Sequence, residues 1–477
     1  MTPLWTASDA VAATHGVTNC DWAATGVSID TRTLQKGDLF VALKDIRDGH
    51  DFVKLALEKG AAAALVSHRP ADVGPGAPLI VVPDVLRGLE ALGIAARARS
   101  KARIAAITGS VGKTSTKEML RTILSRQGRC HAAEASYNNH WGVPLTLARM
   151  PEDADFAVVE IGMSNPGEIA PLSRMTRPHV AMVTTVAAAH LASFDNLDGI
   201  AAEKATIMDG LEPGGIAVLN GDIATSKLLQ DRAEGVGAQI VLFGETTGAW
   251  RISDLRICQD VTVIEVESPG HDYLFKLSVP GRHFALNAVG VLAVAQALGA
   301  DPLAASLDLG LWVPPAGRGT REILQLDPAN EFETLDLIDD AFNANPTSLA
   351  ASLEVIAAGQ PRDGVGRIVK GRRIAILGDM LELGPQEVGM HSAMAENGHL
   401  QQLDLIHCAG PLMKHLWHAL PDTQRGHWTA TAAELAGQAS RLVDAGDVVL
   451  VKGSKGSKIA LVVDAIRKLG HRRLSEQ

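Results

Sequence analysis

The residues from Gly109 to Thr114, Gly-Ser-Val-Gly-Lys-Thr, have the types and spacing to bind phosphate groups. They follow a short apolar run, residues 104–107, and come directly before a stretch with the composition of a helix. Glycines let the backbone approach phosphate oxygens, and free N–H groups at a helix start point at the anion. Lys113 can reach the β- and γ-phosphates of a nucleotide, and the Thr114 hydroxyl can ligate Mg²⁺. Because Ile107 stands where the strict P-loop pattern has its first glycine, the sequence predicts a shorter variant of that loop. An ordinary strand-to-helix turn is the alternative.

Other polar side chains end strand-like runs or begin helix-like ones. Glu160 ends the apolar run 156–160, and near a phosphate loop it could ligate Mg²⁺, which prefers oxygen donors. Capping a helix or forming a salt bridge is the alternative. His283 and Asn287 are four residues apart, so on a helix they share a face and could meet a nucleotide base. A helix cap with a buried hydrogen bond explains them equally well.

Three more candidates also have structural interpretations. His190 follows the strand-like run 180–186, and a lone histidine is more often structural than a ligand. Lys204 has the sequence context of an ordinary lysine on a helix surface. Asn138 and Asn139 begin a segment rich in side-chain amides and turn residues, which either grips a ligand or forms satisfied turns.

Length and composition limit the classes of protein to consider. A chain of 477 residues predicts three domains at about 150 residues each. The apolar share of 46% and the charged share of 21% are typical of a soluble globular protein. A net charge of −10 provides no global basic field for nucleic acid. We expect no signal peptide and no membrane span, since the first residues lack a basic region and no window holds about 18 apolar residues. The four cysteines are far apart without metal-ligand spacing, which indicates a reduced, cytoplasmic protein.

The order of apolar runs predicts an α/β protein with three domains. Residues 1–101 read as a small mixed α/β domain. Residues 102–317 carry near-continuous apolar runs, typical of a P-loop-type, doubly wound, mostly parallel sheet. Within them, residues 252–279 alternate between apolar and polar and predict an appended antiparallel hairpin. Residues 318–477, after a proline- and glycine-rich hinge at 313–319, predict a Rossmann-like sheet with ligands at the strand carboxyl ends. Its expected strands are 335–339, 373–377, 403–407 and 447–451.

Taken together, these motifs resemble those of the Mur ligases of peptidoglycan synthesis. The matching segments are Ser28-Ile-Asp-Thr-Arg32, residues 37–43, residues 107–117, residues 138–144 and Glu160-Ile-Gly162. Residues 340–346 and 376–384 are similar to the signature of the family member that acts last in the cytoplasm. The resemblance spans nearly the whole chain, and many motifs occur in one order.

The resemblance implies roles for individual residues. ATP would be bound by Gly109, Ser110, Val111, Gly112, Lys113, Thr114, Ser115, His283, Asn287, Arg318 and Asp340. Thr114 and Glu160 would bind one Mg²⁺, and His190 with a carbamylated Lys204 would serve a second. Lys113, His190 and Lys204 are therefore the expected catalytic residues. The substrate side would be formed by Ser28, Asp30, Thr31 and Arg32 for the uridine end, and by Asn138, Asn139, Asn343 and Asn345. One segment departs from the family, since Thr184-Thr-Val-Ala187 replaces the common Thr-Asn-Ile-Gly.

The implied reaction is an ATP-dependent carboxylate–amine ligation that releases ADP and phosphate. The terminal carboxylate of UDP-N-acetylmuramoyl-tripeptide would be activated as an acyl phosphate and then attacked by the amine of D-Ala-D-Ala. The resemblance further implies a cytoplasmic monomer, and leaves open whether the third residue of the tripeptide is lysine or diaminopimelate. Two alternatives remain: another Mur-type or folylpolyglutamate-type amino acid ligase, or a P-loop ATPase or GTPase switch that binds a partner.

Overall fold

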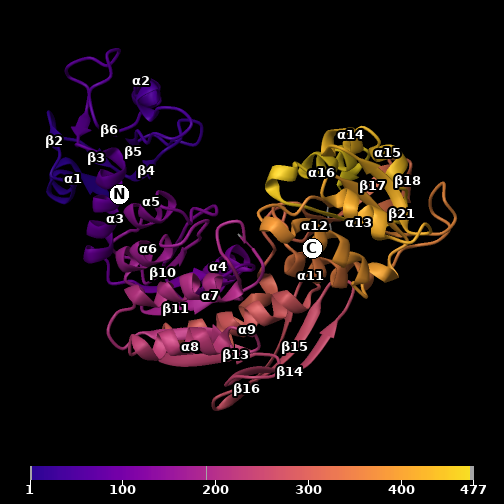
Figure 1. Ribbon diagram of the computed structural model, residues 1–477. Helices are drawn as coiled ribbons and strands as arrows, with labels where there is room; N and C mark the ends of the chain where they lie inside the picture. The colour runs from indigo at the N-terminus through magenta and orange to yellow at the C-terminus, as the bar shows by residue number, and fades with distance from the viewer. Residues whose placement is uncertain (1–2, 190, 473–477) are drawn as a thin grey trace.

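The computed structural model describes residues 3–189 and 191–472. Three α/β units follow one another along the chain, and the N-terminal and C-terminal units lie on either side of the central one (Figure 1). Their sheets lie within residues 17–81, 103–277 and 320–472. The predicted α/β class is therefore confirmed.

The N-terminal unit contains a small mixed sheet. Its strand order is β2-β7-β6-β5-β4, with β2 antiparallel and the others parallel. The strands are β2 (Val17–Thr18), β4 (Gly26–Ser28), β5 (Asp38–Val41), β6 (Ala63–Val66) and β7 (Leu79–Val81), with a separate antiparallel pair β1 (Trp5–Thr6) and β3 (Ala23–Ala24). The helices are α1 (Ala7–Thr14), α2 (Val53–Glu58) and α3 (Val85–Arg99). Helix α3 leads directly into the central unit (Figure 1).

The central unit is built on a nine-stranded sheet in the order β16-β15-β14-β13-β12-β11-β8-β10-β9. Its parallel strands are β8 (Arg103–Thr108), β9 (Cys130–Ala132), β10 (Phe156–Glu160), β11 (Val180–Val183), β12 (Ile216–Asn220) and β13 (Gln239–Gly244). The predicted antiparallel extension is confirmed, as β14 (Trp250–Ile257), β15 (Thr262–Ser268) and β16 (His271–Leu277).

Helices cover both faces of this central sheet. One face packs against α4 (Lys113–Leu124), α9 (Arg282–Ala297) and α10 (Pro302–Asp308). The other packs against α5 (Gly142–Ala148), α6 (Ile169–Thr176), α7 (Leu197–Ala205) and α8 (Ser226–Gly235). This burial on two faces explains why the parallel strands read as continuous apolar runs.

The C-terminal unit has seven strands in the order β21-β20-β19-β22-β18-β17-β23. They are β17 (Thr320–Asp327), β18 (Asn330–Asp340), β19 (Arg373–Gly378), β20 (Leu405–Ala409), β21 (Arg425–Thr429), β22 (Val448–Lys452) and β23 (His471–Arg472). The helices are α11 (Pro346–Ala357), α12 (Glu387–Ala393), α13 (Met413–Ala419), α14 (Ala432–Ala436), α15 (Ala439–Leu442) and α16 (Ala460–Arg467). Strand β17, which pairs antiparallel with β18, was not predicted, and β20 begins two residues later than the predicted strand.

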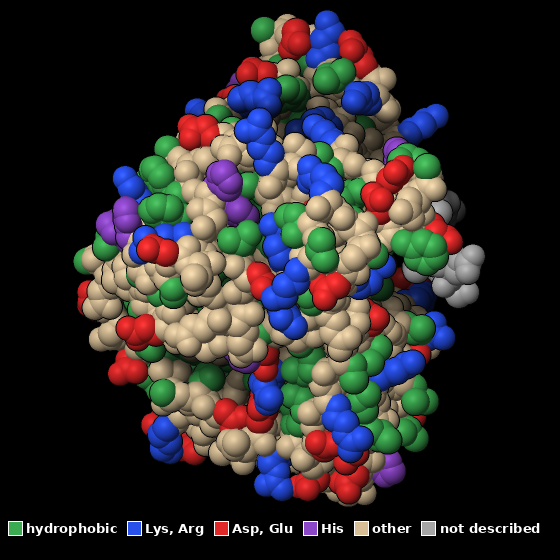
Figure 2. Space-filling view, turned by 90° about the vertical axis from the view of Figure 1, so that its right-hand side faces the viewer, with side chains coloured by type: hydrophobic (Ala, Val, Ile, Leu, Met, Phe, Trp, Pro, Cys, Tyr) green, Lys and Arg blue, Asp and Glu red, His purple; other side chains and the backbone are tan. Residues whose placement is uncertain are grey.

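On the face drawn in Figure 2, charged side chains of neither sign dominate. Basic and acidic side chains are interspersed on the side of the molecule drawn in Figure 2. Among the described residues, no helix has both the length and the apolar character needed to cross a membrane.

Candidate functional site

The phosphate loop lies between β8 and α4 and is fixed by the segment that follows β11. Gly109 has a φ of +154°, and a Cβ there would lie only 1.9 Å from Thr184 Oγ1, so no larger residue fits. Thr184 Oγ1 donates to the carbonyl of Val111 at 2.6 Å. Ser110 Oγ donates to the carbonyl of Ala187 and accepts from its N–H, each at 3.0 Å. The segment that departs from the family pattern therefore still holds the loop in place.

Lys113 opens helix α4 at the edge of a cavity of about 510 Å³. Its Nζ donates to the carbonyl of Gly109 at 2.7 Å, so the side chain folds back over the loop. Burial lowers the pKa of Lys113, while the carboxylate of Glu160 opposes that shift. This geometry suits a lysine that contacts phosphates lying on the loop.

Glu160 ends β10, the strand beside β8, and is only 2% exposed. Its two oxygens lie 2.9 and 3.1 Å from Thr114 Oγ1, and Asn138 Nδ2 donates to Oε1 at 2.7 Å. Ser136 Oγ lies 3.0 Å from the same Thr114 oxygen. Two of the oxygen donors expected for Mg²⁺ thus meet at the mouth of the phosphate loop, and the donor set fits a hard cation that keeps several waters. Glu160 does not cap a helix.

Lys204 lies on α7 and is 1% exposed, so its interpretation as a surface lysine is wrong. Burial, and then the positive charge of Lys113, hold the pKa of Lys204 well below its ordinary value. A neutral amine can capture CO₂, so the environment is compatible with the expected carbamate. His190 lies outside the described residues. No group of three or more His, Cys, Asp or Glu side chains gathers as a metal site in the part of the chain that the structure describes.

His283 and Asn287 lie on α9 and line the same cavity. Asn287 packs against the phosphate loop, since a Cβ on Gly112 would lie 2.9 Å from its Oδ1. His283 Nδ1 is buried without a hydrogen-bond partner among the described residues, and burial lowers the pKa of His283 to about 4. A buried, unsatisfied nitrogen on a neutral ring is open to a ligand, such as a nucleotide base.

The C-terminal unit supplies the facing wall of this cavity. Arg318, in the hinge, lies 4.0 Å over the ring of Phe342 and donates from Nη2 to Ser136 Oγ at 3.2 Å. Asp340, the last residue of β18, accepts from Lys452 Nζ at 2.7 Å. Arg318 and Asp340 thus line the cavity together with the phosphate loop.

The sequence analysis did not identify Lys452 or Ser136. Lys452 ends β22 and is 2% exposed, so the strand-end rule that selected Glu160 would also have selected it. Ser136 gave no signal, because it precedes the amide-rich segment and its contacts with Thr114 and Arg318 come from distant parts of the chain.

Asn343 and Asn345 line the cavity but differ in their contacts. Asn345 is the N-cap of α11: its Oδ1 accepts from the N–H of Ser348 at 2.8 Å, and Ser348 Oγ accepts from the N–H of Asn345. Asn343 is exposed, and its Oδ1 accepts a local bond from Ala344 N–H. The side chain of Asn345 is therefore engaged as a helix cap, whereas the amide of Asn343 remains accessible.

A second cavity, of about 1030 Å³, lies between the N-terminal unit and the segment after β9. Asp30, Thr31 and Arg32 line it, and the guanidinium of Arg32 lowers the pKa of Asp30 through a direct ion pair of 2.6 Å. Ser28 is buried and does not line the cavity; its hydroxyl instead bonds to the backbone of Asp30. Ser28 therefore supports the backbone of the loop that carries Asp30 and does not face the cavity.

The amide-rich segment connects the two cavities. Asn138 and Asn139 line the first cavity, while His140 and Trp141 line the second. Asn139 Oδ1 also accepts from the N–H of Gly142 at 2.9 Å, which forms the expected turn. The turn is therefore confirmed, and because the segment borders both cavities, its contact with a ligand stays a prediction.

Comparisons with known proteins agree along most of the chain. Three family models match successive parts: the catalytic domain of the Mur ligase family at residues 23–123, the Mur ligase middle domain at 107–295 and the Mur ligase glutamate ligase domain at 328–455. The UDP-N-acetylmuramoyl-tripeptide–D-alanyl-D-alanine ligases of Bacillus subtilis and Escherichia coli are 32% and 33% identical to this chain. These alignments cover 92% of this chain and 92% of the former relative, and 93% of this chain and 94% of the latter.

Solved structures with this fold have related names. MurF from Acinetobacter baumannii superposes with a TM-score of 0.82 at 27% identity, covering 97% of this chain and 99% of its own. The MurF ligase from Thermotoga maritima in complex with ADP gives a TM-score of 0.75 at 25% identity, covering 93% and 97%.

Proposed function

This chain belongs to the Mur ligase family, and we propose that it joins D-alanyl-D-alanine to UDP-N-acetylmuramoyl-tripeptide with the consumption of ATP. The observation that carries the proposal is the first cavity, where the phosphate loop faces the carboxyl ends of β18 and β22. A phosphate-binding loop that faces a polar wall from the C-terminal unit is the arrangement needed to bring an acyl phosphate and an amine together.

The two cavities divide the substrates between them. We assign the uridine end of the nucleotide sugar to the second cavity, beside Asp30, Thr31 and Arg32. The peptide would then pass Asn138–Trp141 and bring its terminal carboxylate into the first cavity. We keep residues 1–101, 102–317 and 318–477 as the domains for UDP-sugar, ATP and dipeptide, and assign the enzyme to the cytoplasm as a monomer.

The chemistry follows from these positions. An oxygen of the tripeptide carboxylate attacks the γ-phosphorus of ATP, and ADP leaves. The dipeptide amine then attacks the acyl carbon, phosphate leaves and the amine loses a proton. Lys113 would stabilise the charge on the transferred phosphoryl group, while His283 and Asn287 hold the base and Arg318 and Asp340 bind ATP from the C-terminal unit. Closure of the cavity excludes water, which would otherwise hydrolyse the acyl phosphate.

Magnesium would supply further neutralisation of phosphate charge when bound. We assign Thr114 and Glu160 to one ion, on the strength of their 2.9 Å contact. His190 and a carbamate on Lys204 are assigned to a second. Carbamylation would convert the buried amine into an anionic oxygen donor, which is the ligand type that Mg²⁺ prefers.

The structure bears differently on the two alternatives. A partner-binding nucleotide switch has no use for the large second cavity, which is bordered by the same segment as the nucleotide site. A ligase for another amino acid shares the mechanism, so only the identity of the acceptor distinguishes it.

The test is a phosphate-release assay with purified protein, ATP, Mg²⁺ and UDP-linked tripeptides carrying either lysine or diaminopimelate. We expect release and formation of a UDP-pentapeptide only when D-Ala-D-Ala is added, with one of the two tripeptides preferred. D-Ala alone and D-glutamate are the controls. Phosphate release that requires a single amino acid, or that is the same with and without D-Ala-D-Ala, would overturn the proposal.

A further inference from the structure

The cationic side chains that line the first cavity differ in what already contacts them. Lys113 folds onto its own loop, Arg318 contacts Phe342 and Ser136, and Lys452 is paired with a carboxylate. Lys455 also lines the cavity, is exposed, and makes no ion pair or side-chain hydrogen bond with any described residue. Among the described residues it is therefore the cavity cation whose side chain makes neither an ion pair nor a hydrogen bond within the fold.

The backbone that carries Lys455 is held firmly. Ser454, directly before it, donates from its backbone N–H to the carbonyl of Asp379 at 3.0 Å and from Oγ to the carbonyl of Ala344 at 3.2 Å. The same Oγ accepts from the N–H of Leu381 at 2.9 Å. These bonds tie the loop after β22 to the loops after β18 and β19, so Lys455 projects from a fixed position.

The charges of this wall favour an anion. Asp340, the carboxylate on the C-terminal side of the cavity, is already matched by Lys452 at 2.7 Å. Asn343 and Ser348 on this wall are neutral. Arg318 lies beside the phosphate loop, where it contacts Ser136 and is assigned to ATP. Lys455 is therefore the described cation of this wall that has no ion-pair partner and no assigned ligand.

We propose that Lys455 binds the carboxylate of the incoming dipeptide and selects acceptors that carry one; this deepens the proposed function and rests on it. The amine of the dipeptide must approach the acyl phosphate, at the phosphate-loop end of the cavity. An extended dipeptide spans about 7 Å, so its carboxylate points to the opposite, C-terminal wall. A lysine ammonium is a compact charge on a flexible stem, which suits a carboxylate without demanding one fixed geometry.

The test compares D-Ala-D-Ala with its C-terminal amide in the wild type and in Lys455→Gln. The wild type should use the amide about 10- to 100-fold less efficiently, because a charge-assisted contact is lost. Lys455→Gln should show a rise of similar size in the apparent KM for D-Ala-D-Ala, and should no longer distinguish the two acceptors. The KM values for ATP and the UDP-tripeptide should stay within about twofold, since the proposed contact of Lys455 is with the dipeptide.

Two further variants serve as controls. Lys458→Gln removes an exposed lysine three residues further on that does not line the cavity, and should behave as wild type. Lys455→Arg keeps the charge and should keep the preference for the carboxylate. Undiminished discrimination in a folded Lys455→Gln protein would overturn the assignment of Lys455 alone. A wild type that does not ligate D-Ala-D-Ala with any tripeptide would overturn the proposed function and this inference together.

Discussion

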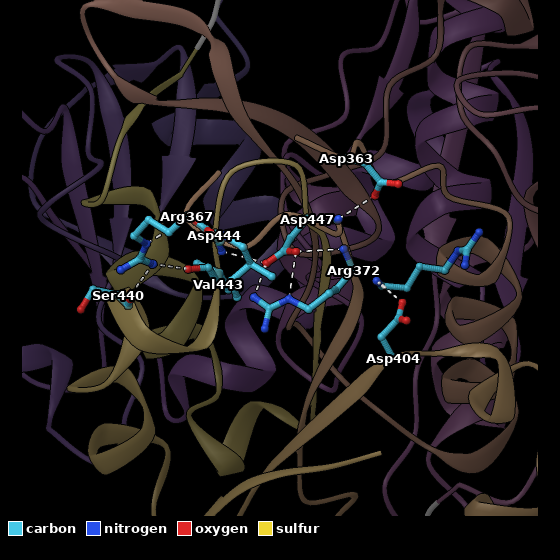
Figure 3. A network of polar contacts seen from close by, with 11 residues as sticks. Asp363, Arg367, Arg372, Asp404, Ser440, Val443, Asp444 and Asp447 are labelled. Carbon is cyan, nitrogen blue, oxygen red and sulfur yellow. Dashed lines mark hydrogen bonds and ion pairs between the residues drawn. The ribbon is translucent and has the colours of Figure 1, made fainter. Parts of the chain in front are cut away.

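The two ends of the C-terminal parallel strands carry different polar chemistry. At the amino end, Asp447 accepts from the backbone N–H and Nη2 of Arg372 and from the N–H of Asp444, and Asp444 accepts from Ile368 and Arg367 (Figure 3). These charges are satisfied within the fold. At the carboxyl end, Asn343 and Lys455 instead face a cavity.

The central sheet repeats the contrast. At its amino end, His179 Nδ1 accepts from the N–H of Ile104 at 3.0 Å, which joins two neighbouring strands. At its carboxyl end, Thr114 and Glu160 meet beside the phosphate loop. In both sheets the polar groups at the amino end bond within the fold, whereas those at the carboxyl end line a cavity, which is where ligands bind in open α/β sheets. Variants at the two ends should therefore fail in different assays.

The largest expected effect is at Lys204. Lys204→Ala should lower the ligation rate by roughly 10³-fold, because the proposed carbamate and its oxygen donors would be lost. Since alanine leaves space at a buried position, added formate or acetate should restore part of the rate. The measurement is the rate of product formation against the concentration of added carboxylate. If the variant is fully active and the ligation rate of the wild type does not depend on CO₂, this lysine has no role in catalysis.

Lys113→Ala tests the phosphate loop itself. We expect a loss of roughly 10²- to 10³-fold in kcat/KM, because the positive charge of Lys113 that would stabilise the transferred phosphoryl group is lost. The melting temperature should hold, since among the described residues Lys113 Nζ donates one hydrogen bond, to the loop carbonyl of Gly109. Near-normal turnover at an unchanged melting temperature would remove Lys113 from the mechanism.

Asp447→Asn tests the opposite end, and should affect stability alone. Breaking a buried pair leaves Arg372 uncompensated and should cost about 3–5 kcal/mol of unfolding free energy, measured by urea denaturation. Asp422→Asn is the control, because its pair with Arg425 is largely exposed and should cost less than about 1 kcal/mol. Activity per folded molecule should be unchanged in both. A large fall in kcat for folded Asp447→Asn would break the division between the two ends.

Acid should weaken the amino end of the central sheet through His179. Burial, followed by nearby arginines, lowers the pKa of His179 to about 4, whereas an unfolded histidine titrates near 6.5. Between these values the unfolded chain binds the extra proton, so stability is full above about pH 6.5 and falls as the pH drops toward 4. Because the ring is only partly buried, we expect roughly 1–2 kcal/mol for this group.

The measurement is the melting temperature from pH 7.5 to pH 5 for the wild type and His179→Asn. The variant keeps a side-chain acceptor for the N–H of Ile104 but cannot titrate, so its melting temperature should depend less on pH. Identical pH profiles for the two proteins would show that another group is responsible.

The sequence predicted the features that are local, and missed those made by distant contacts. Glu160 and the loop at Gly109 could be located because a strand, a turn and a helix follow one another within a few residues. Strand β17 was missed because its side chains are mostly part-buried, which leaves a weak alternation. The burial of Lys204 was also invisible, because it depends on how α7 packs and not on its neighbours in the chain.

The smallest effects are expected at Asn343 and Asn345 in the loop after β18, where we expect one residue to stabilise the fold and the other to contact substrate. Asn345 caps α11 through a reciprocal pair of bonds with Ser348, so Asn345→Ala should lower stability by about 1 kcal/mol. It should leave the ratio of the three substrate KM values near that of the wild type. The melting temperature and the three KM values together give the comparison.

Asn343→Ala should instead weaken dipeptide binding and leave stability unchanged. Asn343 lies two residues before Asn345, and its accessible amide lines the cavity. A side-chain amide can donate to and accept from the backbone of a dipeptide, and losing one such contact should raise the KM for D-Ala-D-Ala by about 3- to 10-fold. The KM for the UDP-tripeptide and the melting temperature should change little. If Asn343→Ala instead lowers stability and raises every KM alike, both asparagines belong to the scaffold. The dipeptide would then be held on this wall by the charge of Lys455 and by backbone groups alone.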